Sequence, residues 1–358
     1  MLESDASAQP RRRRWQPKQH ATDPEQSHTE VSSRQPEAAQ PDMAPSGSAV
    51  WLLGRRCVTL GLADGVVQRF PLPVEVKSGS RAVRDPLHSG AVLVLENGSS
   101  RVWRLALSAK PLRAEELTDA AEAARFRSSL GSRLLSCRSG QALFVTGTPN
   151  QGAHTPWLFD LETRCWHKLP SAPHPILSSA AVASDGAVII AGGWSKERSC
   201  HGHVQTLHLQ TASWTISAAP PVPWRRPGAG CFAGGRLHIA LGWMECEGQV
   251  GSTDFRMLPR NGAAQLARTS SSRLCIVEPG SRAPLRELAA LPLADSFEHS
   301  GELYMIGKQL VCIGRDHVQA FDLQQESWRT LTLPQELSTD NSSSWVKHCG
   351  SWALACLT

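Results

Sequence analysis

The residues best suited to chemistry form one short cluster, Cys200-His201-Gly202-His203. A thiol and two imidazoles are ligands that zinc accepts, and His-x-His spacing on a strand places both rings on one face. A zinc site needs three or four ligands, and the sequence identifies no other one for this cluster. We therefore expect polar loop residues here, and we predict no metal, no cofactor and no catalytic residue.

Other catalytic motifs are missing from the sequence. Neither GxxxxGK[ST], whose amides cradle phosphates, nor the GxSxG of hydrolases occurs. The ten cysteines are scattered without CxxC spacing, which argues against zinc ribbons and thioredoxin-like chemistry. The sequence therefore favours a noncatalytic protein. The alternative is an atypical enzyme with a site, metal-dependent or not, in a central channel.

Charge and hydrophobicity limit the class of partner. The formal net charge of +5 and the pI near 8.7 are only mildly basic, short of the concentrated Lys/Arg field that nucleic-acid binding requires. No apolar h-region follows Met1, and no apolar stretch is long enough to span a bilayer. We expect a cytoplasmic protein, with the nucleus as the alternative, that binds a protein or peptide rather than nucleic acid or a membrane.

The composition changes near residue 49. Residues 1–48 are rich in Pro, Gln, Ser and charge, so they cannot bury enough apolar area to offset the entropy of ordering, and we predict a disordered arm. The basic run Arg11–Arg14 within it is interpreted as a solvated segment, with a nuclear-import signal or a docking patch for an anionic partner as alternatives. Residues 49–358 alternate short apolar runs with turn residues, which predicts strands throughout. Only 114–125 has the pattern of a helical turn.

The strand pattern repeats along the chain. Trp166, Trp214 and Trp328 each follow an apolar strand and a four-residue turn, and the first two are 48 residues apart. That spacing is typical of a four-stranded propeller blade. A second self-match relates residues 305–314 to residues 52–61, so the first folded segment is predicted to be built on the same unit.

The clearest unit, from about Leu177 to Trp214, resembles the kelch-repeat family. Its second strand ends in the double glycine Gly192-Gly193, and Phe159 and Phe321 stand where the family usually has tyrosine. Paired glycines let the backbone turn where strands crowd the axis, and the tryptophan is expected to pack between neighbouring blades. The resemblance implies substrate recognition for ubiquitin ligases or a scaffolding role. No BTB or F-box domain precedes the repeats, so a ligase role would need a separate adaptor.

These observations predict an all-β fold, a single β-propeller of four-stranded antiparallel blades. We expect six blades, with seven as the alternative. The units lie near residues 78–117, 125–169, 177–217, 228–289 and 296–333. A sixth would combine Val50–Leu72 with Ser344–His348 and Trp352–Leu357, so that strands from both ends of the chain close it. The fourth of these units contains a predicted insertion near residues 245–271, which is too long for an ordinary loop.

Strand parity predicts the binding face. In an antiparallel meander, the loop between the second and third strands and the loop between blades open on the same side. Tryptophan and arginine are common binding hot spots. The hypothesis is that an acidic or aromatic peptide docks on that side; the alternative is that each tryptophan covers its own blade. The residues predicted to bind it are Trp194, Lys196, Arg198, Trp224, Arg225, Arg226 and Trp243.

Overall fold

The computed structural model describes 18 segments of the chain, and every structural statement below refers to them. They are residues 47–128, 131–137, 141–146, 154–177, 179–184, 186–193, 199–201, 203–217, 227–233, 236–241, 246–247, 254–257, 273–277, 286–290, 302–306, 308–313, 318–331 and 353–357. The predicted arm lies outside them except for Gly47 and Ser48, and so does Arg11–Arg14. No helix within the described segments is both long and apolar enough to cross a bilayer.

Five sheets each contain four antiparallel strands in chain order. Blade 1 comprises β3 (Arg81–Arg84), β4 (Ala91–Leu95), β5 (Val102–Ala106) and β6 (Arg113–Glu116). Blade 2 comprises β7 (Leu134–Cys137), β8 (Ala142–Val145), β9 (Trp157–Asp160) and β10 (Cys165–Lys168). Blade 3 comprises β11 (Ala180–Ser184), β12 (Ala187–Ala191), β14 (Val204–His208) and β15 (Ser213–Ser217).

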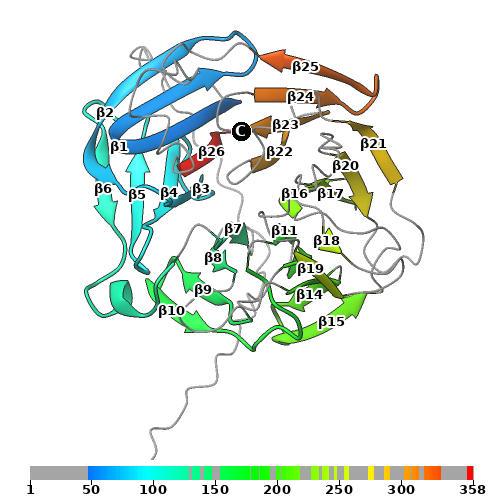
Figure 1. Cartoon of the computed structure of the whole chain (residues 1–358). Coiled ribbons are helices and arrows are strands. Elements are labelled where there is room, and N and C mark those ends of the chain that lie inside the picture. Colours follow the sequence, from blue (N-terminus) through cyan, green and yellow to red (C-terminus); the bar gives the residue numbers. More distant parts are fainter. Residues whose placement is uncertain are drawn as a thin grey trace, which may run out of the picture. The chain divides into compact units, whose positions relative to one another are not determined.

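Blade 4 comprises β16 (Pro227–Ala233), β17 (Arg236–Leu241), β20 (Arg273–Val277) and β21 (Arg286–Ala290). Blade 5 comprises β22 (Glu302–Ile306), β23 (Gln309–Ile313), β24 (Val318–Asp322) and β25 (Ser327–Leu331). The first strand of each blade contacts the first strand of the next, as the packing of β3, β7, β11, β16 and β22 in Figure 1 shows. The five blades coincide with the five units predicted from the repeats.

A sixth sheet has three strands, in the order β2 (Val67–Val76), β1 (Ser48–Gly61) and β26 (Ala353–Leu357). The prediction of six or seven four-stranded blades, the last closed by strands from both chain ends, is therefore wrong: the described residues form five four-stranded blades, and the sheet in which β1 pairs with β26 has three strands. Val50–Leu72 was expected to supply separate strands. Instead β1 is one element of 14 residues that bends at Gly54, where φ is +57°, and its ends meet where the Leu62 amide donates to the Gly47 carbonyl at 2.9 Å.

The related segment 305–314 is divided between β22 and β23, and β1 likewise has two arms, since residues 48–52 pair with β26 whereas residues 56–60 pair with β2. The two similar segments therefore both turn back on themselves. The predicted strand Ser344–His348 lies outside the described residues. Within the predicted insertion, β18 (Cys246–Glu247) and β19 (Asp254–Met257) pair with β13 (Ser199–His201) in a small separate sheet.

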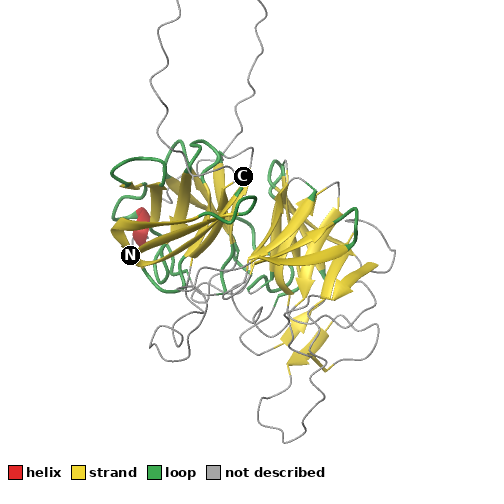
Figure 2. Ribbon diagram, turned by 90° about the horizontal axis from the view of Figure 1, so that it is seen from above, coloured by secondary structure: helices red, strands yellow, loops and turns green. Residues whose placement is uncertain are grey.

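The core lies between neighbouring blades, because the middle strands are apolar on both faces. In β8, Leu143 and Val145 pack against Leu93 of blade 1, while Phe144 on the opposite face packs against Ile190 of blade 3. Successive residues of a strand point to opposite faces, so one strand contributes to two inter-blade cores. Figure 2 shows these stacked sheets from above, with the single short helix η1 (Glu122–Ala124) in red.

The double glycine has the backbone conformation that its position requires. Gly192 and Gly193 follow β12 with φ values of +64° and +143°, a region that side chains with a Cβ rarely adopt. The Gly192 amide donates to the His203 carbonyl at 3.0 Å. The interpretation of this pair as a turn is confirmed.

A buried glutamine on β14 fastens the connection between blades 2 and 3. Gln205 is fully buried; its Oε1 accepts from the His174 amide at 2.8 Å and its Nε2 donates to the His174 carbonyl at 3.3 Å. Gln319 occupies the same position of β24 and is also fully buried. Its amide has no hydrogen-bond partner within the described structure. The same residue type at equivalent positions therefore has different effects on stability: the Gln205 side chain is hydrogen-bonded, whereas that of Gln319 is not within the described residues.

Replacing each glutamine by methionine separates these roles. Gln205→Met should lower the free energy of unfolding by about 1–3 kcal/mol, since the main-chain groups of His174 lose their partners. Gln319→Met should be neutral or stabilising, because it removes a buried amide that is unsatisfied. Urea denaturation of both variants measures the difference. Equal losses would contradict the assigned roles.

Candidate interaction face

The predicted hot-spot residues lie outside the described structure. This holds for all seven: Trp194, Lys196, Arg198, Trp224, Arg225, Arg226 and Trp243. Of the metal-like cluster, Cys200 and His201 belong to β13, and the His203 ring stacks on His174 with centroids 3.9 Å apart. No group of three or more candidate metal ligands occurs among the described side chains.

Three described segments belong to the same side of the propeller, and we call them the connecting-loop face. They are the β2–β3 connection (77–80), the β4–β5 loop (96–101) and the first part of the β6–β7 connection (117–128). The Asn97 amide donates to Ser80 Oγ at 3.1 Å, and Ser128 Oγ donates to the Glu96 carbonyl at 2.6 Å. The Ser100 amide donates to the Ala123 carbonyl at 3.1 Å. The three segments are therefore one hydrogen-bonded layer.

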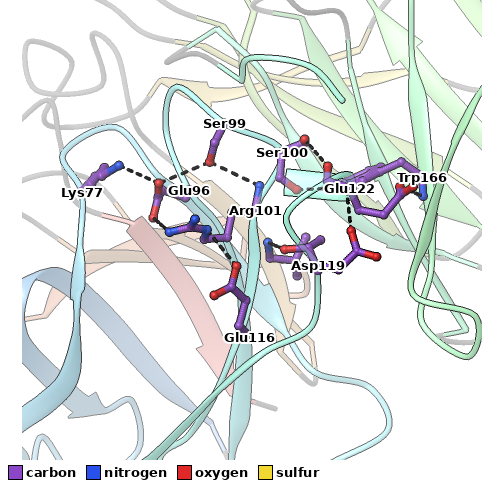
Figure 3. Close-up of polar contacts among 11 residues, drawn as sticks. Lys77, Glu96, Ser99, Ser100, Arg101, Glu116, Asp119, Glu122 and Trp166 are labelled. Atoms are coloured by element: carbon purple, nitrogen blue, oxygen red, sulfur yellow. Dashed lines mark hydrogen bonds and ion pairs between the residues drawn. The ribbon is translucent and has the colours of Figure 1, made fainter. Parts of the chain in front are cut away.

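Glu96 is the first polar centre of this layer. Its Oε1 lies 2.6 Å from Lys77 Nζ and accepts from Ser99 Oγ at 3.3 Å, as Figure 3 shows. Its Oε2 lies 3.9 Å from a terminal nitrogen of Arg101, whose Nε is 2.9 Å from Glu116 Oε1. Lys77 comes from the connection between the three-stranded sheet and blade 1. The Glu96 carboxylate therefore links these two sheets.

Glu122 is the second polar centre, and it links blade 1 to blade 2. Its Oε2 accepts from the Trp166 amide at 2.7 Å, while its Oε1 accepts from Nε and a terminal nitrogen of Arg125 at 3.0 and 2.8 Å. Its main-chain carbonyl accepts from Ser100 Oγ, and its amide donates to Asp119 Oδ1 at 2.8 Å (Figure 3). The side chain is buried, so these bonds hold the loop in one conformation.

Aromatic packing surrounds the same junction. Trp166 Nε1 donates to the Ser100 carbonyl at 2.8 Å, and its ring lies 4.8 Å from both Phe126 and Phe159. Trp214 of blade 3 similarly donates from Nε1 to the Pro170 carbonyl, at 3.0 Å. The prediction that these tryptophans pack between neighbouring blades is confirmed. The loop face therefore rests on a rigid foundation.

The ion pairs of this face have a consistent orientation. Each buried carboxylate is paired with an exposed cation: the Glu96 and Glu122 side chains are 8% and 7% exposed, whereas Lys77 and Arg125 are 58% and 52% exposed. Arg127, in the same loop, is exposed as well. Asp119 and Glu116 add negative charge at the surface, whereas the carboxylates of Glu96 and Glu122 lie beneath their cations and cannot contact a partner directly. The face therefore presents basic groups.

Four buried cysteines of the described structure are poor nucleophiles. Burial raises the pKa of the Cys57 and Cys356 thiols to about 12 and that of Cys231 to about 11. Burial also raises the pKa of the Cys312 thiol. A thiol that is protonated at neutral pH reacts slowly. These cysteines act as small apolar residues of the core.

A second network connects blades 1 and 2 away from this face. Asp85 is fully buried and lies 2.6 Å from Arg104 Nε. Arg104 pairs with Glu115 at 2.8 Å, and Glu115 pairs with Arg164 of blade 2 at 2.6 Å. Burial raises the pKa of Glu115, but hydrogen bonds and charge from Arg164 and Arg104 outweigh it and hold the pKa below its ordinary value of 4.5. The folded protein thus favours the ionised form of the Glu115 carboxylate.

We expect Glu122→Ala to destabilise the protein by about 3 kcal/mol, because the Trp166 amide loses its buried, charged acceptor and Arg125 loses its ion-pair partner. Glu162→Ala is the matched control, since Glu162 is exposed and should change stability by no more than about 0.5 kcal/mol. Urea denaturation measures both. A loss that is equal in the two variants would show that Glu122 does not fasten the blades.

The Glu115 bridge should make stability depend on pH. A carboxylate whose pKa is lowered by folding stabilises the folded state above its unfolded pKa, and this contribution disappears as the pH falls through the folded value. Glu115→Gln should therefore lower the melting temperature slightly at pH 7, by a free energy below about 1 kcal/mol because the pair is partly exposed. Melting curves should converge with those of the original protein below pH 4.5. Curves that stay apart in acid would argue against the bridge.

Comparisons with known proteins identify the fold. No protein-family model matches the chain, and no curated protein matches it. Among solved structures, a chain in the crystal structure of a nidogen/laminin complex matches with a TM-score of 0.57 and 11% sequence identity, over 87% of this chain and 98% of that one. The kelch resemblance is not confirmed. At this low identity the match shows the fold alone, which is a β-propeller.

Proposed function

We propose that this chain is a noncatalytic protein-interaction module that binds a partner through the connecting-loop face. The observation that carries the proposal is the orientation of the ion pairs on that face. The carboxylates of Glu96 and Glu122 point into the protein, while their partners Lys77 and Arg125 reach solvent, where they can also contact the carboxylates of a partner. Such a face attracts an acidic segment of a partner.

The rigidity of the face supports the same function. Its loops are fixed by main-chain hydrogen bonds and by the buried carboxylates of Glu96 and Glu122, so little conformational entropy is lost when a partner binds. The similar chain mentioned above comes from a structure described as a nidogen/laminin complex, a protein–protein assembly. That description concerns the other protein, and it is compatible with a binding role here.

The proposal also includes the kind of partner, the cellular role and the compartment. The partner segment is an acidic or aromatic peptide, and the seven predicted hot-spot residues supply the aromatic and basic contacts from the same side. The module serves as a scaffold or as a substrate receptor that a separate adaptor connects to a ubiquitin ligase, in the cytoplasm or the nucleus. Nucleic acid is not proposed as a partner, because the net charge of +5 is small.

A charge reversal tests the proposal. Arg127→Glu should reduce recovery of the partner severalfold in affinity purification from the native cell, because an exposed cation of the face becomes an anion. Alanine at Trp224, Arg225 or Trp243 should reduce it by about 30-fold, the effect of losing a hot spot worth about 2 kcal/mol. The purification is repeated without residues 1–48 to exclude capture by that segment.

The matched control is Arg113→Glu, which changes the net charge equally on the exposed edge of β6. It should leave recovery unchanged. If all the variants recovered the partner as well as the original protein does, the connecting-loop face would not be the binding surface. Stoichiometric metal in the purified protein would instead favour the enzyme alternative.

A further inference from the structure

Within the part of the chain that the structure describes, the outermost strand of each propeller sheet has one edge without a strand neighbour, and most of these edges are protected. Charged residues or prolines on an edge strand prevent it from pairing with another chain. Five of the six outermost strands that the structure describes carry them: Arg69 and Pro71 in β2, Arg113 and Glu115 in β6, Lys168 in β10, Arg286 in β21 and Arg329 in β25. The remaining strand, β15 of blade 3, contains neither.

Strand β15 reads Ser213-Trp214-Thr215-Ile216-Ser217, and its surface is polar but uncharged with one exposed apolar side chain. Ile216 is 47% exposed, one of the few large hydrophobic side chains with that exposure in the described structure. Trp214 is fixed by its hydrogen bond to the Pro170 carbonyl. Thr215 Oγ1 lies 3.2 Å from His208 Nε2, so it is held by the neighbouring strand. The edge is therefore ordered and ready to accept another strand.

The sequence of β15 is nearly symmetric about Thr215. If two copies of this strand pair antiparallel around that residue, Ser213 lies opposite Ser217, Trp214 opposite Ile216, and Thr215 opposite Thr215 of the other copy. Aromatic residues opposite β-branched ones and hydroxyl residues opposite each other are favourable cross-strand pairs. A two-fold interface requires such self-complementarity, because the same surface is used by both subunits.

We propose that β15 is a homodimer interface at which two propellers join edge to edge in this register. The occupant of the edge is a second copy of the chain, because every cross-strand pair in that arrangement is matched and none brings like charges together. The interface uses the outer rim of blade 3. It is independent of the connecting-loop face and leaves that face free for another partner.

Strand β25 shows why its edge does not pair in the same way. It occupies the same position in blade 5 and has a similar sequence, Ser327-Trp328-Arg329-Thr330-Leu331, with Trp328 packed on Phe321 at 4.8 Å. Arg329 stands where Thr215 stands in β15, and its guanidinium donates to Gln309 Oε1 at 2.9 Å. Pairing two copies would place the two arginines opposite each other, which is unfavourable.

The first test measures self-association by analytical ultracentrifugation of the full chain. The original protein should sediment as a dimer. Thr215→Arg should raise the dissociation constant about tenfold or more, because like charges meet on the two-fold axis. Thr330→Arg on β25 is the matched control, with the same new charge on the other edge, and should remain dimeric. Normal melting curves for both variants show that they fold.

A cysteine at the axis tests the register. Thr215→Cys should form an intermolecular disulfide on oxidation, since directly opposed residues of antiparallel strands have Cα atoms about 5 Å apart, within disulfide range. Ser213→Cys should not, because its two copies are offset by about 13 Å along the strands. The original protein under the same oxidant corrects for its own cysteines.

Each contrary outcome overturns the proposal. A monomeric original protein at the highest soluble concentration would do so, even if a strand of some other protein were later found on β15. A dimer that Thr215→Arg leaves intact would place the interface elsewhere. Equal cross-linking of the Thr215→Cys and Ser213→Cys variants would exclude the symmetric register.

Discussion

The structure depends on the burial of apolar faces between neighbouring sheets. A strand such as β8 is buried on both faces, so blade 2 is stable only with blades 1 and 3 beside it. The hydrophobic contribution of one blade is therefore inseparable from that of its neighbours. The ion pairs of Glu96 and Glu115 and the hydrogen bonds of Glu122 fit this requirement, because they join neighbouring sheets at their loops or at their exposed edges.

The loops between blades are subject to a second constraint. They carry main-chain polar groups past the ends of an apolar core, and these groups need hydrogen-bond partners. Glu122 and Gln205 meet this constraint in the same way: each is buried, and each binds main-chain groups of a neighbouring segment. A buried carboxylate is costly unless it is paired, and both Glu96 and Glu122 have cations at their solvent side. The basic character of the connecting-loop face thus follows from how its loops are held.

The sequence was sufficient for the repeating parts of the fold. Tryptophan spacing located the blades, and the double glycine located the turn after β12, because these features are local and recur. The blade count failed at the sheet of β2, β1 and β26, which has three strands; the further strand predicted for it, Ser344–His348, lies outside the described residues.

The candidate site was only partly predictable. Strand parity predicted a binding side, which stays a prediction, and the residues chosen for it were tryptophans, arginines and a lysine that lie outside the described structure. The centres that the structure shows, Glu96 and Glu122, were missed. Residues 114–125 were predicted as a helical turn, whereas 113–116 form β6 and only Glu122–Ala124 are helical. Asp119, three residues before Glu122, was the one available signal, because that spacing caps a short turn.

The indole hydrogen bonds give the series of blades a direction. Trp166 of blade 2 donates to the β4–β5 loop of blade 1, and Trp214 of blade 3 donates to the connection that leaves blade 2. Both of these junctions are therefore completed by a residue that leaves the ribosome after the blade it secures. While the chain is being synthesised, the newest blade always has an unfinished loop layer and an uncovered apolar face. A nascent propeller of this kind must be shielded from other chains until its later blades emerge.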